Sequence, residues 1–112
     1  MQKLSSLLAF MHQRDFEFLV LELLESIGYE DIKITKESGT KGVEVTANIQ
    51  FGISMVPEVI HVRRYQATTG RPALEQLRDA VKRHNCLHGT LITLGRFTRE
   101  CKDAVMASDG GV

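Results

Sequence analysis

The chain has 112 residues, the size of one domain, and 43% of them are apolar while 25% are charged. This composition argues against a disordered chain, and the absence of a long apolar run or a secretory h-region argues against a membrane or secreted protein. The formal net charge is zero, so the total charge gives no sign of a polyanionic partner.

The charge is nevertheless unevenly distributed. Residues 61–83 contain six basic residues and two acidic ones, whereas residues 15–31 contain acids but no Lys or Arg. This distribution is compatible with an enzyme that combines a basic, phosphate-binding face with an acidic metal pocket. It is equally compatible with ordinary solvated helix faces, and charge alone does not separate the two interpretations.

The two cysteines and three of the four histidines give no sign of a metal site. Cys86 and Cys101 lack CxxC or other metal-ligand spacing, so we expect two reduced, partly buried thiols in a cytoplasmic protein. His12, His84 and His88 form no recognisable ligand pattern.

The first predicted element follows a lead-in of residues 1–14. Asp15 suits the N-cap of a helix, and Gly28 suits its left-handed C-terminal position. Between them, apolar residues recur with helical period. They are Phe16, Leu19, Val20, Leu23, Leu24 and Ile27.

Three strands are predicted next. In residues 30–36, Ile32 and Ile34 alternate with polar residues, and "ESGTKG" has the composition of a turn. Residues 43–50 alternate most clearly, with Val43, Val45, Ala47 and Ile49 on one side and Glu44, Thr46, Asn48 and Gln50 on the other. A third strand over residues 57–65 places Ile60 and Val62 on one face and His61 and Arg63 on the opposite one.

The remaining elements are a helix, a strand and a helix. Pro72 fits an early position of a helix whose apolar stripe includes Leu74, Leu77 and Val81. A buried strand over residues 89–95 and a closing helix, with Thr98 as its N-cap, precede a tail of residues 108–112. The order α-β-β-β-α-β-α predicts an α/β fold: three antiparallel strands, a fourth reached by a parallel crossover, and helices on both faces of a mixed sheet.

This arrangement predicts a polar site on one face of the sheet. If the second and third strands pair, Glu44 lies close to His61 and Arg63, and Glu17 joins them if the first helix covers that face. Carboxylates and an imidazole can hold a divalent cation against a scissile phosphate, and a nearby guanidinium can stabilise the charge of the phosphate.

Each of these residues also has an ordinary structural interpretation. Glu44 and His61 can simply be the polar half of alternating strands, and Arg63 a surface charge. Glu17 can favour the start of a helix through the helix dipole. Spacing alone does not decide between these interpretations and a site.

Three segments in the same order resemble the Mrr-type restriction endonuclease catalytic domain. Residues 15–45 contain a helix beginning Phe-Glu, then Gly-Tyr, a strand and a Ser-Gly-x-x-Gly turn. Residues 61–81 contain Arg-Tyr, a Gly-Arg-Pro-Ala loop and a helix with a glutamine, and residues 89–104 resemble the closing strand and helix of the family. The resemblance implies the PD-(D/E)XK nuclease fold, a restriction-endonuclease-like α-β-β-β-α-β core, as a single domain over residues 15–107.

The departures from the family pattern fall on its catalytic positions. Glu44 stands where the family has a metal-binding aspartate, His61 where it has glutamine or glutamate, and Arg63 where it has lysine, while the helix glutamate is retained as Glu17. The longer carboxylate shifts the geometry, the imidazole disfavours Mg²⁺ relative to Mn²⁺, and a guanidinium cannot act as a base near neutral pH.

The resemblance implies an endodeoxyribonuclease in which Glu17, Glu44 and His61 hold a divalent metal, Mg²⁺ or Mn²⁺, and Arg63 contacts the scissile phosphate. Candidate DNA contacts are Arg64, Tyr65, Arg71, Gln76 and Lys82. The altered positions predict weakened or absent cleavage. The alternatives are a catalytically inactive module that binds DNA or regulates a partner protein, and a protein-interaction module. By resemblance, a homodimer and a separate DNA-recognition domain or protein are further expected partners.

Overall fold

A computed structural model describes residues 12–37, 42–63, 70–93 and 99–106 of the chain. Among these residues no helix is long and apolar enough to cross a membrane. The described elements follow the predicted order. They are α2 (Gln13–Ile27), β1 (Glu30–Glu37), β2 (Gly42–Phe51), β3 (Ser54–Arg63), α3 (Arg71–Arg83), β4 (His88–Ile92) and α4 (Arg99–Met106). Thr98 and the tail of residues 108–112 lie outside the described part of the chain.

The four strands form one mixed sheet in the order β1-β2-β3-β4. β1 pairs with β2, and β2 with β3, in antiparallel orientation, whereas β3 pairs with β4 in parallel through α3. The predicted antiparallel trio and parallel crossover are therefore confirmed, and the fold is the restriction-endonuclease-like α/β core.

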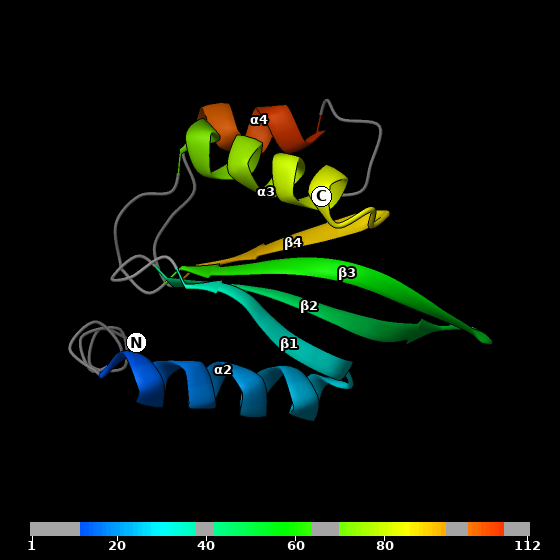
Figure 1. Cartoon of the computed structure of the whole chain (residues 1–112). Helices are drawn as coiled ribbons and strands as arrows, with labels where there is room; N and C mark the ends of the chain where they lie inside the picture. The colour runs from blue at the N-terminus through cyan, green and yellow to red at the C-terminus, as the bar shows by residue number, and fades with distance from the viewer. Residues whose placement is uncertain (1–11, 38–41, 64–69, 94–98, 107–112) are drawn as a thin grey trace.

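Helices cover both faces of the sheet, with α2 on one side and α3 and α4 on the other (Figure 1). The alternation of each strand supplies apolar side chains to both layers. The core on the α2 side consists of Phe16, Val20, Leu24, Val43, Val45, Ala47, Ile60 and Val62. The core on the α3 side is built around Val59, Leu77 and Ala80.

The first helix starts earlier than predicted and buries only part of its apolar stripe. It begins at Gln13, and its N-cap is His12, whose Nδ1 accepts a hydrogen bond from the Arg14 backbone N–H at 3.2 Å. The prediction of Asp15 as the N-cap was therefore wrong, because an imidazole nitrogen supplies the acceptor. Gly28 adopts the predicted left-handed conformation with φ of 117°. Phe16, Val20 and Leu24 are buried, whereas the other stripe residues, Leu19, Leu23 and Ile27, are exposed.

A tight turn joins β2 and β3. Phe51 pairs with Ser54, so Gly52 and Ile53 form a two-residue loop. Gly52 has φ of 65° and Ile53 does not have positive φ, the pattern of a type II′ turn. This turn starts β3 three residues before the predicted position at Pro57, and it fixes the register of the whole hairpin.

At the other end of the hairpin, the two strands approach very closely. Gly42 opposes Arg63, has φ of 142°, and a Cβ built on it would lie 1.9 Å from the Val62 carbonyl oxygen. Only glycine fits this position. The close approach holds the last residues of β3, including Arg63, against the first residues of β2.

The cysteines are free, as predicted, with Cys101 buried and Cys86 partly buried. Burial, with the nearby negative charge of Glu58, raises the pKa of the Cys86 thiol. Both observations fit unreactive structural thiols.

Candidate functional site

The centre of the site is a pair of residues that face each other across the β2–β3 hairpin. Glu44 and His61 are direct partners in the antiparallel register, on the face that α3 covers. The Nε2 atom of His61 lies 3.0 Å from Oε1 of Glu44. Glu44 is only 6% exposed, so its charge is compensated by neighbours rather than by bulk water.

A β-bulge in the neighbouring strand adds a hydroxyl group. Ile34 pairs with Val45 and Lys36 pairs with Glu44, which leaves Thr35 as an extra residue in β1. The Thr35 hydroxyl donates to Oε2 of Glu44 at 2.7 Å. The bulge therefore fixes one carboxylate oxygen from the edge of the sheet.

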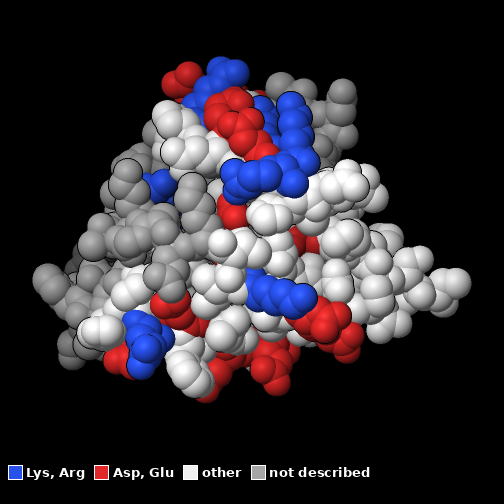
Figure 2. Space-filling view, in the orientation of Figure 1, with Lys and Arg blue, Asp and Glu red and all other residues white. Residues whose placement is uncertain are grey.

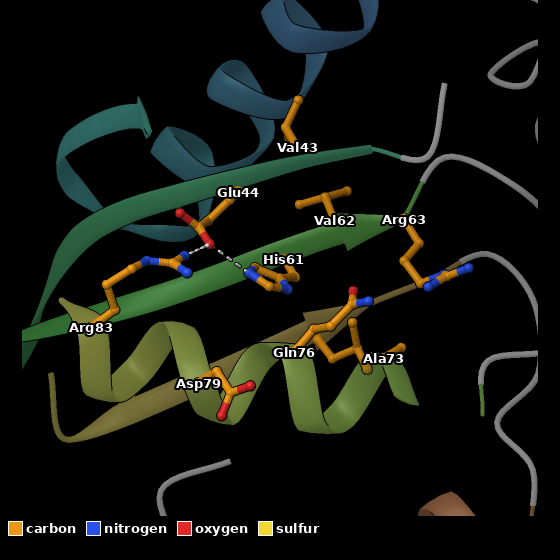
Figure 3. A pocket seen from close by; sticks show the side chains of 10 residues that line it. Val43, Glu44, His61, Val62, Arg63, Ala73, Gln76, Asp79 and Arg83 are labelled. Atoms are coloured by element: carbon orange, nitrogen blue, oxygen red, sulfur yellow. Dashed lines mark hydrogen bonds and ion pairs between the residues drawn. The ribbon is translucent and has the colours of Figure 1, made fainter. Parts of the chain in front are cut away.

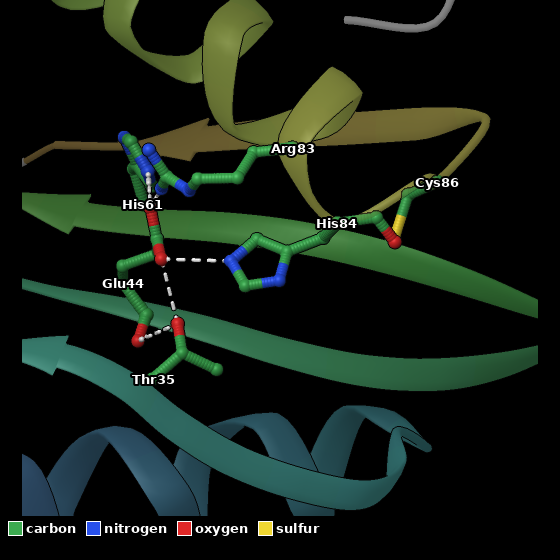
Figure 4. A network of polar contacts seen from close by, with 6 residues as sticks. All are labelled: Thr35, Glu44, His61, Arg83, His84 and Cys86. Carbon is green, nitrogen blue, oxygen red and sulfur yellow. Dashed lines mark hydrogen bonds and ion pairs between the residues drawn. The ribbon is translucent and has the colours of Figure 1, made fainter.

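The end of α3 supplies two more donors. Arg83 donates from one of its terminal guanidinium nitrogens to Oε1 of Glu44 at 2.6 Å, and Nε2 of His84 lies 3.0 Å from Oε2 (Figure 4). The helix ends in a Schellman motif: Asn85 has φ of 56° and its N–H bonds to Lys82, while the N–H of Cys86 bonds to Val81. This motif stops the helix at the point where His84 reaches the carboxylate.

These four contacts lower the pKa of the Glu44 carboxyl group. Burial alone would raise its pKa, but the hydrogen bonds from Thr35, His84 and His61 and the positive charge of Arg83 outweigh burial and lower the pKa to about 2. At neutral pH Glu44 is thus ionised and can only accept hydrogen bonds. The Nε2 atoms of both histidines must therefore carry the donated hydrogen.

A cavity of about 430 Å³ opens beside this cluster, between the hairpin and α3 (Figure 3). Its walls include Glu44, His61, Arg63, Gln76 and Arg83. The Nε atom of Arg63 is buried and has no hydrogen-bond partner among the described residues. A buried donor without a partner costs free energy, so this atom is suited to an anionic ligand.

The structure brings three of the predicted site residues together, but it does not place Glu17 with them. Glu44, His61 and Arg63 all line the cavity. Glu17 lies on α2, which covers the opposite face of the sheet (Figure 1), and it is not among the described residues that contact Glu44. Glu17 is expected at the site only if the first helix covers the polar face, and α2 covers the other face.

The predicted DNA contacts do not all lie at the cavity. Gln76 lines the cavity, and Lys82 is exposed further along α3. Arg71, at the start of α3, lies 3.5 Å from Glu75 and 3.9 Å from Glu100 in exposed ion pairs. Arg64 and Tyr65 lie outside the described residues.

Comparison with known proteins identifies the family. The family model of the Mrr-type restriction endonuclease catalytic domain matches residues 8–112. The chain belongs to the Mrr-type restriction endonuclease family. It is also 28% identical over 102 residues to the type IV methyl-directed restriction enzyme EcoKMrr of Escherichia coli (strain K12). The match covers 87% of this chain but only 33% of EcoKMrr, so the chain spans about a third of the length of that relative. The search of solved structures gave no match.

Restriction endonucleases typically use divalent metals, but the arrangement around Glu44 does not fit such an ion. A carboxylate offers about four lone-pair positions. In this Mrr-type domain each oxygen of Glu44 already accepts bonds from two residues, His61 and Arg83 on one and Thr35 and His84 on the other. Within the described part of the chain, no group of three or more His, Cys, Asp or Glu side chains could hold a metal.

Sequence reasoning missed the two donors from α3. His84 fits no ligand spacing in the sequence, yet it contacts Glu44. In the sequence, Arg83 is only one member of the basic segment. The available signal was topological: α3 connects the parallel strands β3 and β4, so it must pack over the face that carries Glu44 and His61. The residue at which α3 ends, however, depends on the left-handed conformation of Asn85.

Proposed function

We propose that this Mrr-type domain acts on DNA by binding a backbone phosphate in the cavity beside Glu44, and that it hydrolyses phosphodiester bonds slowly. The observation that carries the proposal is Arg63, which lines the same cavity as Arg83 and whose buried Nε lacks a partner among the described residues. A guanidinium matches the geometry of phosphate oxygens better than any other side chain.

The charged residues that line the cavity are two acids, Glu44 and Asp79, and two arginines, Arg63 and Arg83. Arg83 is engaged by Glu44, which leaves Arg63 as the cation available to a phosphate. Gln76, on the helix side, is a neutral donor to the same space.

Slow cleavage follows from the chemistry of the altered residues. Arg63 stands at the lysine position of the family but stays protonated, so it stabilises charge without taking a proton from water. Glu44 would have to release a donor before it could take a metal. The predicted Mg²⁺ or Mn²⁺ is thus no part of the proposed step, and adding metal becomes a variable of the test.

The test combines nicking of a supercoiled plasmid with a gel shift at low salt, in Mg²⁺, Mn²⁺ or EDTA. Arg63→Gln removes the phosphate contact, and Arg14→Gln, an exposed arginine on α2 on the other side of the sheet, is its control. We expect DNA retention to fall at least tenfold in Arg63→Gln and to stay unchanged in Arg14→Gln, with slow nicking that is lost together with retention. Equal retention by the wild type and Arg63→Gln would contradict the phosphate site.

The four donors on Glu44 favour a second candidate function, a catalytically inactive module that binds DNA or regulates a partner protein. Salt-sensitive retention without nicking under any condition would support this candidate over the first. A homodimer and a separate DNA-recognition domain or protein remain proposals. Light scattering of the free domain and of its DNA complex tests the first, and binding to DNA of varied sequence tests the second.

A further inference from the structure

The outward side of α2 carries a stripe of exposed apolar side chains. Leu19, Leu23 and Ile27 follow one another at intervals of four residues, so they lie in a row along the helix. They are 39%, 45% and 56% exposed, and Phe18, next to this row, is 64% exposed. Other residues of α2 form the core with the sheet, so the stripe is not what holds the helix in place. Neighbouring exposed apolar side chains of this kind mark an interaction surface.

Acidic side chains border this stripe. Asp15, Glu22 and Glu25 are exposed, and Asp15 and Glu22 flank Phe18 at spacings of three and four residues. Within the described part of the chain, none of the three acids forms an ion pair. Arg14 is the only basic residue in the sequence of α2, and Figure 2 shows acidic side chains along the α2 edge of the molecule. The surface is therefore both apolar and negative.

This combination excludes several occupants. Nucleic acid and anionic lipid surfaces are repelled by the acids, and helices that lie on membranes carry basic polar faces instead. In a two-fold dimer the same patch meets itself, so pairing of α2 with α2 would bring acids against acids. A ligand for this surface needs apolar side chains together with positive charges.

We propose that the outward face of α2 binds a basic amphipathic helix of a partner protein. The 15 residues of α2 give a helix about 22 Å long, enough for four turns of a partner helix. Apolar side chains of the partner, repeating every three to four residues, would pack on the row from Leu19 to Ile27, and its lysines or arginines would lie beside Glu22 and Glu25. The inference does not depend on the phosphate site, because α2 and the cavity lie on opposite faces of the sheet.

The two parts of the surface have different effects on binding. Burial of the apolar stripe supplies the affinity, so its loss speeds dissociation. Exposed ion pairs contribute little to affinity. The acids instead attract the basic helix and orient it, so their loss slows association and reduces its salt dependence.

The first experiment uses a synthetic helix of about 18 residues, five turns, with leucines on one face and lysines on the other. A twin peptide has glutamates in place of the lysines. Surface plasmon resonance with the full chain measures both rates, and we expect the acidic twin to bind at least tenfold more weakly. The double variant Leu19→Ser with Leu23→Ser should lower the affinity for the basic peptide at least tenfold, through faster dissociation. Leu87→Ser, at a leucine that is 73% exposed ahead of β4, is the matched control and should change nothing.

The acids are tested by the double variant Glu22→Gln with Glu25→Gln. Association with the basic peptide should lose most of its salt dependence, while the dissociation rate stays the same. Asp103→Asn, at an exposed position on α4, should leave both rates unchanged. Salt dependence that responds equally to Asp103→Asn would mean that the peptide senses only the overall charge, and this would overturn the site.

The remaining outcomes are equally decisive. Equal binding of the two peptides, or unchanged binding by the leucine double variant, would overturn the proposal. A dimer of the free chain that light scattering shows to dissociate in the leucine double variant would assign the surface to a second copy and overturn it as well. Circular dichroism checks the fold of each variant, and Phe18→Ser, at the most exposed apolar side chain of α2, provides a second test of the stripe. DNA retention should be unaffected by these variants, so a failure here is distinct from a failure of the proposed function.

Discussion

At the scale of single residues, Glu44 is the charged centre of the site. A buried carboxylate without partners would be protonated or destabilising, but this one receives four hydrogen bonds from side chains on three different elements and on the turn that ends α3. Glu44 lies on β2, and its partners come from β1, β3 and the end of α3. Its ionisation is therefore coupled to the packing of α3 on the sheet.

The low pKa of Glu44 predicts a specific loss of stability in acid. Its ordinary pKa is 4.5 and its pKa in the fold is about 2, so the unfolded chain binds the proton more tightly. The stabilisation is complete above pH 4.5 and disappears as the pH falls through 2; it is on the order of 2–3 kcal/mol. Denaturant titrations of the wild type and Glu44→Gln should differ most at neutral pH and converge as the pH falls. A difference that does not change with pH would contradict the prediction.

The four hydrogen-bond donors on Glu44 predict that metal binding to this carboxylate is weakened but not abolished. The double variant Arg83→Gln and His84→Gln frees a lone pair on each oxygen of the carboxylate, so we expect Mn²⁺ binding to strengthen about tenfold or more, measured by calorimetry or by electron paramagnetic resonance. Lys82→Gln, which changes the exposed neighbour of Arg83, is the control. Wild-type protein that binds Mn²⁺ as tightly as the double variant would mean that Glu44 gives up its donors readily.

At the scale of secondary-structure elements, the β2–β3 hairpin positions the site through two glycines with different constraints. Both have positive φ, 142° at Gly42 and 65° at Gly52. A Cβ at Gly42 would collide with the Val62 backbone, whereas a Cβ at Gly52 would have no atom within 4 Å. Gly42 therefore sets the separation of the strands beside Arg63, and Gly52 sets only the conformation of the turn.

This difference predicts unequal costs for the same substitution. Gly42→Ala should destabilise the domain by about 3 kcal/mol or more, since it combines backbone strain with a steric clash, and it should weaken DNA retention by moving Arg63. Gly52→Ala should cost less, about 1–3 kcal/mol from the strain of an alanine with positive φ alone, and should leave DNA retention unchanged. Urea denaturation and the gel shift measure both effects, and equal costs at the two positions would refute the argument.

The elements also show where sequence reasoning succeeds and where it fails. Alternation has period two, so once β2 and β3 pair in antiparallel register, Glu44 and His61 must share a face. An apolar helical stripe shows that α2 is packed but not which face of the sheet it covers, so the sequence left the place of Glu17 conditional on that face. Arg83 and His84 depend on where a helix ends, and that end is fixed by the unusual backbone of Asn85.

At the scale of the whole molecule, the two faces of the sheet differ in character. Figure 2 shows basic side chains gathered mainly over α3 and α4, with acids among them, and acids predominating along the α2 edge. The α2 surface also exposes apolar residues. They are Phe18, Leu19, Leu23 and Ile27. A polyanion is repelled from the acidic face, so DNA is expected to approach from the side of α3 and the cavity.

The salt dependence of DNA binding tests this orientation. Each cation that neutralises a phosphate releases about one counterion, so removing it should lower the slope of log affinity against log salt by about 1. We expect this change in both Arg63→Gln, in the cavity, and Lys82→Gln, on the exposed side of α3. The two should still differ, because Arg63→Gln also leaves a buried phosphate oxygen without its donor and therefore lowers affinity more strongly at every salt concentration. Glu22→Gln, an exposed position on α2, should leave the slope unchanged. A slope that responds to Glu22→Gln but not to Lys82→Gln would place the DNA on the α2 face and reverse the orientation proposed for the domain.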